Sequence, residues 1–461
     1  MPTVMKFGGT SVADARAFEN VARIVASQSH AAPVVVVSAM SGVTDALLAA
    51  TIAAGEGRAG EAIASLENTW RRHRETATQL LDAAAAQSFA HHVDNAATHI
   101  NKLLSASADD AHHRRQTQDA VLAFGEMLSS ALLAEVINQR GVKAQHVDAR
   151  RCIVTDAQYT SAQPLTAETF SRTHDQLTPL IDDGFVPVMG GFIASTQEGT
   201  TTTLGRGGSD YTAALIGAAL PAEEIQIWTD VTGVLTADPR VVPEAQTVQR
   251  LSYAEASELA YFGAKVLHPK TIQPAIEGSI PVRICNSHEP DQVGTLVGPQ
   301  TETTTRTIKA IAHKGGVTTV QITSARMLGA YGFLRALFEV FERHRTVVDV
   351  VATSEVSVSL SLDDASALPI IVEDLELLGT VRVEKGCAIV CVVGEGLRGT
   401  PGIAARVFSA ISDINVTLIS QGASSINFTF AIEEERVQEA VQRLHHEFFG
   451  PQRGTKDTRS E

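Results

Sequence analysis

The sequence lacks the features that mark several large classes of protein. It has no long run of basic residues, and its net charge is −15, with 37 Lys and Arg against 52 Asp and Glu. This balance argues against nucleic acid or an anionic membrane as the main partner, while it leaves room for a local basic pocket that holds a small phosphate. The cysteines form no CxxC pair, which favours reduced thiols in a cytoplasmic protein. The four are Cys152, Cys285, Cys387 and Cys391.

No window of the sequence approaches the roughly 20 apolar residues that a membrane-spanning helix needs. The first residues, MPTVMKFGGTSV, also lack the basic region and the long apolar segment of a signal peptide. We therefore expect a soluble, cytoplasmic protein with no membrane partner. The remaining composition is typical of a globular protein, with 44% apolar and 19% charged residues. A chain of 461 residues is too long for one ordinary core, so two or three domains are expected.

Residues 1–300 alternate short β-rich runs with helical patterns. The runs TVMKF, VVVVSA, FVPVMGGFIA, EIQIWT and PVRIC are short, apolar and β-branched, as buried strands are. A helix is predicted over 12–27, with Phe18, Val21 and Val25 on one face. This alternation predicts an α/β domain, a three-layer sandwich around a mostly parallel sheet. Residues 56–140 are expected to form a long helical insertion.

The polar, Thr-rich stretch 298–307 marks a domain boundary, and an internal repeat follows it at an offset of about 70 residues. Each copy is expected to contain a strand, a loop, a helix and two further strands, so two small α+β units are predicted. Six positions carry the repeat: Gly332, Phe333, Phe338, Phe341, Val356 and Val358 align with Gly402, Ile403, Phe408, Ile411, Ile426 and Phe428.

The motif KFGGTSV follows the first predicted strand. Gly8 and Gly9 allow backbone N–H groups to approach an anion closely, and the next helix directs its positive end toward them. Lys6 would reach the same phosphates as a point charge. Ser11 with Asp14 fits a capping box at the helix start. The alternative is a tight strand-to-helix turn whose lysine extends to solvent.

A second glycine-rich helix start, TTTLGRGGSDYTAAL, covers residues 201–215. Two such turns in one α/β domain suggest that both ends of a polyphosphate are held. Arg206 offers a planar fork suited to a carboxylate or phosphate. Asp210 is unusual beside anionic oxygens, and organising Lys6 would explain it. The alternative is that Ser209 or Asp210 is a simple N-cap.

Three further patterns are less specific. In WTDVTGVLTADPR (228–240), Thr229 and Asp230 follow a strand, where nucleotides are commonly bound. The sequence GEGLRG (394–399) matches G-x-G-x-x-G, but no acidic residue ends the following strand, so we interpret it as a loop of the repeat. The histidine pairs at 91–92 and 112–113 have no metal-ligand spacing, and we assign them to helix surface.

Six motifs together point to a family. KFGGTSV, SAMSGVTD, FGEMLSS, TTTLGRGGSDYTA, WTDVTG and GAKVLHP occur in an order that resembles the aspartokinases of the amino-acid-kinase fold. The repeat resembles a tandem pair of ferredoxin-like ACT domains, the first over about 317–384 and the second over about 385–450 with a strand from 308–316. The resemblance therefore implies a catalytic domain over 1–300 and a regulatory region over 308–461.

The resemblance implies transfer of the γ-phosphoryl group of ATP, with Mg²⁺, to the β-carboxylate of L-aspartate, the first step of lysine, threonine and methionine biosynthesis. A carboxylate is already ionised at pH 7, so catalysis reduces to positioning and charge neutralisation. By this resemblance Lys6 bridges the phosphates and Asp210 organises it, while Arg206 clamps the α-carboxylate and Glu126 takes the α-ammonium. The same pocket is expected to include Gly8, Gly9, Ser38, Ser41, Thr44 and Ser209.

The nucleotide half of the family site maps onto a second set of residues. One position departs from the family pattern G-[IV]-Y-T-x-D-P-R, because Leu235 replaces the usual tyrosine. An aromatic neighbour of the nucleotide is thereby lost, which puts nucleotide affinity in question. The implied nucleotide residues are Thr229, Asp230, Leu235, Asp238, Arg240, Lys265 and Val266.

The first ACT unit resembles the lysine-binding site of monofunctional, lysine-inhibited aspartokinases, through MLGAYGFL and VVDVVATSEVSVSL. Asp349 and Glu355 suit a ligand with ammonium groups, and the alternative is that both are ordinary acids at strand ends. ACT units commonly pair between chains, so a homodimer or tetramer is expected. The other implied lysine contacts are Met327, Gly332, Phe333, Leu334, Val348 and Ser354.

Two other functions fit parts of the pattern. The same fold could phosphorylate glutamate, acetylglutamate or UMP, but Glu126 argues against an acetylated amine, which carries no charge. A non-catalytic amino-acid sensor with an inactive kinase domain is the other alternative, and intact Lys6, Arg206 and Asp210 argue against it. The sequence leaves open whether lysine, threonine or both inhibit.

Overall fold

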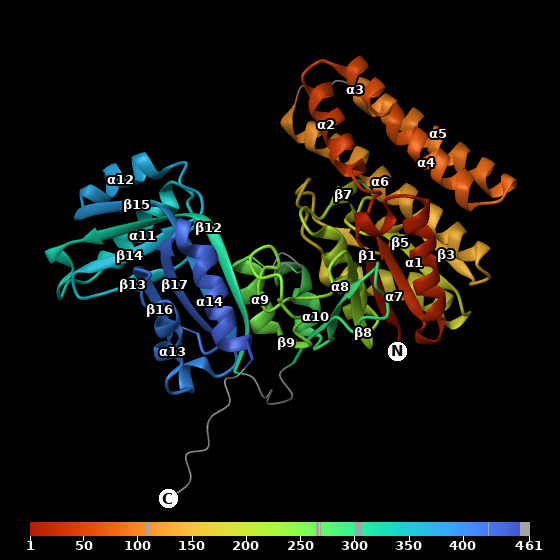
Figure 1. Ribbon diagram of the computed structural model, residues 1–461. Helices are drawn as coiled ribbons and strands as arrows, with labels where there is room; N and C mark the ends of the chain where they lie inside the picture. Colours follow the sequence, from red (N-terminus) through yellow and green to blue (C-terminus); the bar gives the residue numbers. More distant parts are fainter. Residues whose placement is uncertain (107–109, 264–266, 268, 300–306, 423, 452–461) are drawn as a thin grey trace, which may run out of the picture. The chain divides into compact units, whose positions relative to one another are not determined.

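The computed structural model describes residues 1–106, 110–263, 267, 269–299, 307–422 and 424–451 (Figure 1). The chain forms two compact units. Unit 1 comprises Met1–Val234, Gln249–Tyr253 and Val266–Gln300, and unit 2 comprises Leu235–Val248, Ala254–Lys265 and Thr301–Glu461. Two segments that precede residue 300 thus belong to unit 2. All four cysteines are buried and unpaired, as the sequence indicates.

Unit 1 contains an eight-stranded sheet in the order β3-β5-β2-β1-β8-β10-β11-β9. Every pairing from β3 to β10 is parallel, and β11 is antiparallel to β10. The predicted strands are confirmed, except that FVPVMGGFIA is divided between β5 and β6. The bounds are β1 (Thr3–Phe7), β2 (Pro33–Val37), β3 (Ala144–Val147), β5 (Val186–Gly190), β8 (Glu224–Thr229), β9 (Arg250–Ser252), β10 (Val282–Asn286) and β11 (Thr295–Gly298), with β4 (Val154–Thr155), β6 (Ile193–Thr196) and β7 (Thr201–Thr203) in a separate three-stranded sheet.

Helices cover both faces of the large sheet, which confirms the three-layer α/β architecture. Met5 and Phe7 of β1 belong to a core shared with α1 and α6. The intervening Val4 is register-paired with Ile225, and Ile225 packs against Gly217 of α8 on the other face. The helices of unit 1 are α1 (Ala15–Ser27), α2 (Val43–Gly55), α3 (Ala59–Ser65), α4 (Glu67–Leu80), α5 (Ala83–Ser105), α6 (Ala111–Gln139), α7 (Thr166–Asp182), α8 (Gly208–Ala219) and α10 (Gln273–Glu277).

Helix α1 begins three residues later than predicted. Asp14 caps it by accepting a hydrogen bond from the N–H of Ala17 at 2.9 Å. Residues Gly9–Val12 form a separate 3₁₀ turn, and the Ser11 hydroxyl donates to Ser287 Oγ at 2.9 Å rather than to the helix. The predicted capping box of Ser11 with Asp14 is therefore wrong, because the Ser11 hydroxyl bonds instead to Ser287, directly after strand β10.

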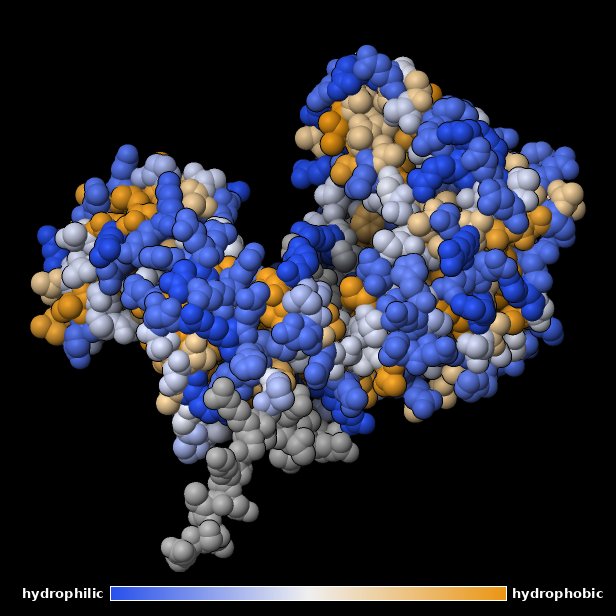
Figure 2. All heavy atoms as spheres, in the orientation of Figure 1, coloured by the Kyte–Doolittle hydropathy of each residue, from blue (hydrophilic) through white to orange (hydrophobic). Residues whose placement is uncertain are grey.

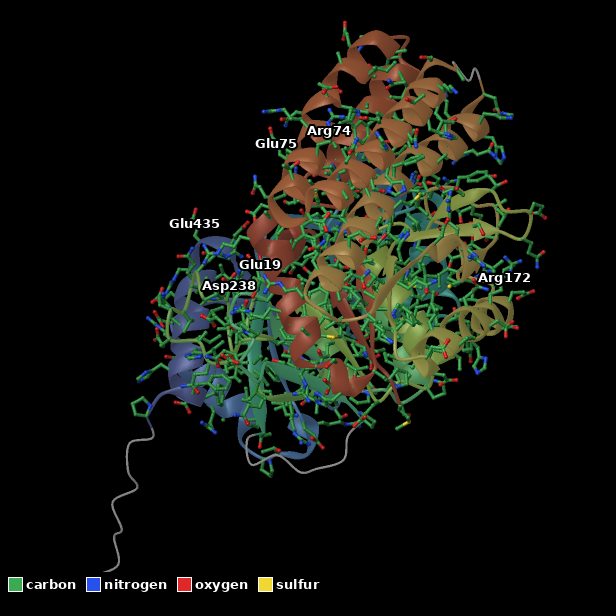
Figure 3. The ribbon with its side chains drawn as sticks, turned by 90° about the vertical axis from the view of Figure 1, so that its right-hand side faces the viewer. Glu19, Arg74, Glu75, Arg172, Asp238 and Glu435 are labelled. Atoms are coloured by element: carbon green, nitrogen blue, oxygen red, sulfur yellow. The ribbon has the colours of Figure 1, made fainter. Side chains whose placement is uncertain are left out.

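The predicted helical insertion comprises α3, α4, α5 and part of α6. Figure 1 shows α4 and α5 side by side beyond the sheet. Arg74 of α4, labelled in Figure 3, joins the two helices through an ion pair with Asp94 of α5 at 2.7 Å, and it also pairs with Glu67 of its own helix at 3.0 Å. The second half of α6, by contrast, is core: fourteen of its residues between Asp119 and Ile137 are buried. The insertion boundary at residue 140 is thus too late.

Helix α6 also corrects the prediction about membrane helices. By length and composition alone it could cross a membrane, whereas no window of the sequence was expected to approach that limit. In the fold, 72% of its most apolar window is buried inside the protein. Such burial is typical of the central helix of a large globular domain, so its hydrophobicity is explained by packing against β2 and β5.

Unit 2 is built on a six-stranded antiparallel sheet in the order β13-β14-β12-β15-β17-β16. The aligned glycines of the repeat, Gly332 and Gly402, are both helix N-caps with φ of 82° and 83°. The elements are β12 (Ile308–Thr323), β13 (Val351–Thr353), β14 (Ser357–Leu362), β15 (Thr380–Gly394), β16 (Val416–Gln421), β17 (Asn427–Glu433), α11 (Phe333–Arg343), α12 (Leu368–Glu376), α13 (Ile403–Ala410) and α14 (Val437–Phe449), together with α9 (Tyr253–Tyr261).

Two long strands, β12 and β15, run through both halves of the sheet (Figure 1). The first part of β12, from Ile308 to Lys314, pairs with the end of β15 in the second repeat unit. After a register shift, the rest of β12 pairs with the beginning of β15 in the first. Two separate apolar cores correspond to the two repeat units. The G-x-G-x-x-G stretch lies in the loop between β15 and α13.

Candidate functional site

The carboxyl ends of β1, β2, β5 and β8 lie at one edge of the parallel sheet, where α/β folds commonly bind ligands. A cavity of about 710 Å³ opens there, entirely within unit 1. It brings together every predicted catalytic and aspartate-binding residue and two of the predicted nucleotide residues. These are Lys6, Gly8, Gly9, Ser38, Ser41, Thr44, Glu126, Arg206, Ser209, Asp210, Thr229 and Asp230.

The glycine turn before α8 needs its glycines for two physical reasons. Gly205 and Gly207 have φ of 74° and 73°, in the left-handed region that side chains disfavour. A Cβ on Gly207 would also lie 2.8 Å from Thr271 Cγ2. Gly207 is itself the N-cap of α8, so the alternative that Ser209 or Asp210 caps this helix is wrong. The first turn of α8 lines the cavity and places the positive end of the helix dipole there.

Lys6 and Asp210 form an ion pair in the cavity wall. Lys6 Nζ lies 2.6 Å from Asp210 Oδ1, and their side chains are only 12% and 17% exposed. Lys6 Nζ is also 3.8 Å from the place where a Cβ on Gly8 would be. Asp210, which follows the second glycine turn, therefore holds the Lys6 ammonium group next to the first glycine turn at Gly8 and Gly9.

Glu126 carries an unpaired carboxylate oxygen. Its Oε1 accepts a hydrogen bond from the N–H of Ala39 at 3.1 Å, while its buried Oε2 has no hydrogen-bond partner among the described residues. The residue is 3% exposed, and burial raises the pKa of its carboxyl to about 8. Arg206, at another wall of the same cavity, is exposed and makes no ion pair with any residue the structure describes. The cavity thus offers an acidic group with one unpaired oxygen and a basic group without an ion-pair partner among the described residues.

Two hydrogen bonds connect the loop after β2 to its neighbours. The Ser38 hydroxyl donates to Ser209 Oγ at 3.0 Å, and the Ser129 hydroxyl donates to the Ser38 carbonyl at 2.8 Å. These contacts fix the position of the predicted substrate loop against both α6 and α8.

One buried acidic group at the site was not predicted. Asp119 is fully buried and accepts hydrogen bonds from Thr160 and Thr203, both of which line the cavity. Burial raises the pKa of its carboxyl to about 6, against the opposing effect of these hydrogen bonds. Asp119 precedes Glu126 by seven residues, or about two helical turns, so both acids lie on the same face of α6. An acidic residue on this otherwise apolar face is the sequence signal that could have identified Asp119.

The predicted nucleotide residues are divided. Thr229 and Asp230 line the cavity, and the Thr229 hydroxyl donates to Asp230 Oδ1 at 3.1 Å. Leu235, Asp238 and Arg240 belong to unit 2 and are not among the cavity residues. Arg240 pairs with Asp238 (labelled in Figure 3) at 2.6 Å, and hydrogen bonds from Arg240 lower the pKa of Asp238. Lys265 and Val266 lie outside the described residues.

Within the part of the chain that the structure describes, no group of three or more His, Cys, Asp and Glu residues could hold a metal ion. The histidine pairs predicted to lie on helix surface are exposed, on α5 and at the beginning of α6.

The residues predicted to bind lysine form two sets in unit 2. Asp349 lies at one end of the hairpin β13–β14, where its N–H donates to the Ser361 carbonyl at 3.0 Å. Ser354 and Glu355 lie at the turn, where the Ser354 N–H donates to the Ser357 carbonyl at 2.8 Å. The five residue steps from Asp349 to Ser354, at about 3.3 Å each in extended chain, span about 16 Å. Val348, directly before Asp349, belongs to the first set. The second set lies near the turn: Met327 follows Ser324, whose N–H donates to the Val356 carbonyl beside the turn. Shortly after Met327, α11 begins with its N-cap Gly332, followed by Phe333 and Leu334.

Asp349 is engaged by its surroundings in unit 2. The Tyr261 hydroxyl donates to Asp349 Oδ1, and Lys314 pairs with Asp363 while its ammonium lies 5.0 Å from the centre of the Tyr261 ring. Burial, with the nearby Asp363 as a second cause, raises the pKa of the Asp349 carboxyl to about 7. Its Oδ2 is buried without a hydrogen-bond partner among the described residues. Glu355, by contrast, is exposed.

Comparison with known proteins decides the family. The model of the amino acid kinase family matches residues 1–286, and a model of the ACT domain matches residues 390–448. Lysine-sensitive aspartokinase 3 of Escherichia coli is 37% identical over 454 residues, covering 97% of this chain and 99% of the relative. The chain belongs to the aspartokinases. Aspartokinase 1 of Arabidopsis thaliana, a chloroplastic protein, is 38% identical over 463 residues, which cover 97% of this chain and 80% of the relative.

Solved aspartokinase structures agree with this assignment. Aspartokinase III of E. coli in complex with aspartate and ADP has a TM-score of 0.79 at 36% identity, covering 97% of this chain and all of that one. The same relative with lysine and aspartate gives 0.80, covering 97% and 99%. As an aspartokinase, the chain phosphorylates L-aspartate with ATP and combines this kinase domain with an ACT-containing regulatory region. The alternative of a non-catalytic sensor, and those of other acceptors, are thereby set aside.

Proposed function

We propose that the cavity of unit 1 recognises L-aspartate by its two α-substituents and presents its β-carboxylate to the phosphates between the two glycine turns. Glu126 takes the α-ammonium and Arg206 takes the α-carboxylate. Lys6, held by Asp210, bridges the transferring phosphate, and the first turn of α8 contributes its positive dipole. Ser38, Ser41, Thr44 and Ser209 complete the pocket around the substrate.

The unpaired Oε2 of Glu126 is the observation that carries this proposal. A buried carboxylate oxygen without a partner is costly, and an ammonium group would satisfy it with a charge-assisted hydrogen bond. Arg206 offers a fork of the opposite charge in the same cavity. An acid and a base together match the zwitterionic head of a free amino acid, and they do not match an acetylated amine.

The nucleotide half of the proposal involves Thr229 and Asp230, which line the cavity. The described residues include no cluster that would hold Mg²⁺ alone, and Asp210 is already paired with Lys6. This fits a cation that is held mainly by the phosphates of ATP and by water, with at most one or two protein carboxylates, as Mg²⁺ prefers. When bound, the ion supplies neutralisation of the phosphate charge.

An ATP-dependent hydroxamate assay tests the substrate half directly. The purified chain is offered L-aspartate, L-glutamate and N-acetyl-L-glutamate in parallel at saturating ATP. Product from aspartate alone is expected, because only a free α-ammonium satisfies Glu126 and only the shorter side chain places its carboxylate between the glycine turns. Equal turnover of acetylglutamate would contradict the role of Glu126.

For regulation, we propose feedback inhibition by lysine through the first ACT unit of a homodimer. The E. coli relative is lysine-sensitive by name, and its structure with lysine matches this chain over 97% of its length. Because Asp349 and Glu355 lie at opposite ends of the hairpin β13–β14, one lysine would meet both only if they come from two copies. Figure 2 shows apolar patches on the surface of unit 2. The first ACT unit exposes large apolar side chains that a second copy would cover, namely Leu328, Tyr331, Leu334, Phe338, Val347 and Val356.

Two measurements test the regulatory proposal. Light scattering coupled to gel filtration is expected to give a dimer or a multiple of it, and a monomer at micromolar concentration would contradict the shared site. Repeating the hydroxamate assay with lysine, threonine or both identifies the effector. Inhibition by threonine alone would exclude lysine.

A further inference from the structure

Asp119 of α6 is tied to two segments that form the wall of the cavity. Its two carboxylate oxygens accept hydrogen bonds from the Thr160 N–H, the closer at 2.9 Å, and from the Thr203 N–H at 3.0 Å. The Thr203 hydroxyl donates to Oδ1 at 2.7 Å. Among the described residues, Asp119 makes no ion pair, so its partners are only neutral donors. A buried carboxylate that collects donors from two loops fixes those loops relative to each other.

Both partners of Asp119 adjoin the glycine turn that carries Arg206. Thr203 is the last residue of β7 and precedes Arg206 by three residues. Thr160 has φ of 74°, a left-handed conformation that a threonine adopts at a cost. Its carbonyl oxygen would lie 3.2 Å from a Cβ on Gly205, so the turn is packed directly on the strained segment. The Asp119 carboxylate holds the Thr160 N–H and thereby stabilises that conformation.

Helix α6 also carries Glu126, two turns after Asp119. We propose that Asp119 is a positioning residue for aspartate binding, which fixes the Arg206 turn at a set distance from Glu126. This inference rests on the proposed roles of Arg206 and Glu126. One rigid helix then determines the separation between the group for the α-carboxylate and the group for the α-ammonium. Asp119 itself does not line the cavity.

The test compares Asp119→Asn with the wild-type enzyme in steady-state kinetics over aspartate and over ATP. The asparagine keeps the shape but lacks the negative charge that strengthens all of these hydrogen bonds, and an NH₂ in place of Oδ1 cannot accept from the Thr203 hydroxyl or the Thr160 N–H. The KM for aspartate is expected to rise about 10-fold, while the KM for ATP stays within about 2-fold. An unchanged aspartate KM, or an equal rise of both KM values, would overturn the inference.

Thr203 supplies a matched pair that remains informative if Asp119→Asn fails to fold. Thr203→Ser keeps the hydroxyl that donates to Asp119, and Thr203→Val removes it at nearly constant volume. The serine variant is expected to keep the wild-type aspartate KM and the valine variant to raise it. If the effect passes through Asp119, combining Thr203→Val with Asp119→Asn raises the KM no further than Asp119→Asn alone. Equal KM values for the serine and valine variants, or additive effects in the double variant, would contradict it.

Arg206→Lys separates failure of this inference from failure of the proposed function. Lysine cannot form the bidentate fork, so the aspartate KM is expected to rise. If it rises in Arg206→Lys but not in Asp119→Asn, the positioning role is wrong and the proposed function stands. If it does not rise in Arg206→Lys, Arg206 is not the carboxylate clamp.

Discussion

Glu126 gives the sharpest test of the site, because burial favours the protonated form of its carboxyl whereas binding of an ammonium group requires the ionised form. In the free enzyme its pKa is raised to about 8, so at pH 7 only about a tenth of the molecules carry the ionised form. An ammonium ligand requires that form. Below pH 8 each unit of pH therefore changes the fraction ready to bind aspartate about tenfold.

In the wild-type enzyme, the KM for aspartate is expected to fall roughly tenfold between pH 6 and pH 7 and to level off above pH 8. In Glu126→Gln this dependence should disappear. At pH 8.5 the variant is expected to have a KM about 10- to 100-fold higher, because a hydrogen bond to a charged group contributes about 1.5–3 kcal/mol. The difference in aspartate KM between the wild type and Glu126→Gln should become smaller toward pH 6.

The same substitution should stabilise the fold at alkaline pH. A carboxyl whose pKa is higher in the folded than in the unfolded state favours folding when protonated, and this contribution is lost as pH rises from about 4.5 to about 8. Glu126→Gln removes the loss, so its Tm should exceed that of the wild type at pH 8.5.

The assay is the initial rate of aspartyl hydroxamate formation at saturating ATP, titrated with aspartate at half-unit steps of pH. Glu135→Gln is the matched control, since Glu135 lies on the same helix but is exposed. A wild-type KM that is constant from pH 6 to pH 8, or a Glu126→Gln enzyme with wild-type KM at pH 8.5, would refute the reasoning.

Three further predictions follow from the structure. Lys6→Ala and Asp210→Ala should each lower kcat on the order of 10²-fold, about 3 kcal/mol, and their double variant little further because the two side chains form one ion pair; a folded Lys6→Ala enzyme with near-normal kcat excludes the phosphate role. Leu235→Tyr should tighten ATP binding by about 0.5–1.5 kcal/mol, measured by calorimetry, and unchanged affinity would show that leucine is neutral there. Asp349→Asn should raise the lysine concentration for half-inhibition about 10- to 100-fold at constant kcat. Because the pKa of Asp349 is raised to about 7, inhibition of the wild type should strengthen from pH 6 to pH 8, and a flat profile would contradict this site.

The sequence was sufficient for the parts of the site that local chemistry determines. Gly205 and Gly207 need left-handed backbone, and Lys6 lies on a short buried strand beside Gly8, so their motifs are visible without a structure. The aligned Gly332 and Gly402 likewise predicted two equivalent helix starts. In each case a backbone requirement restricts the residue type at a fixed distance from an element.

The parts that the sequence did not predict depend on contacts between distant residues. Leu235–Val248 belongs to unit 2 because Ala237, Val241 and Val242 pack with Ile308 and Val392, and the Thr236 hydroxyl contacts His445 Nε2 at 2.9 Å. Nothing in the local pattern of an α/β loop indicates such partners. The end of the helical insertion was misplaced for a similar reason, since only packing distinguishes the core half of α6 from its solvated first turns.

The contrast between local motifs and contacts of distant residues also separates Asp349, which the sequence predicts as a site residue, from Asp119, which it does not. Asp349 is predicted as a lysine contact because the segment around it resembles a family motif, whereas its separation from Glu355 follows only from the hairpin register. Asp119 belongs to no motif, and its partners lie 41 and 84 residues away. Each acid has a raised pKa because it is buried, and burial is a property of the assembled fold. A buried acid that collects neutral donors, as Asp119 does, is consequently a positioning group that a structure reveals and a motif search passes over.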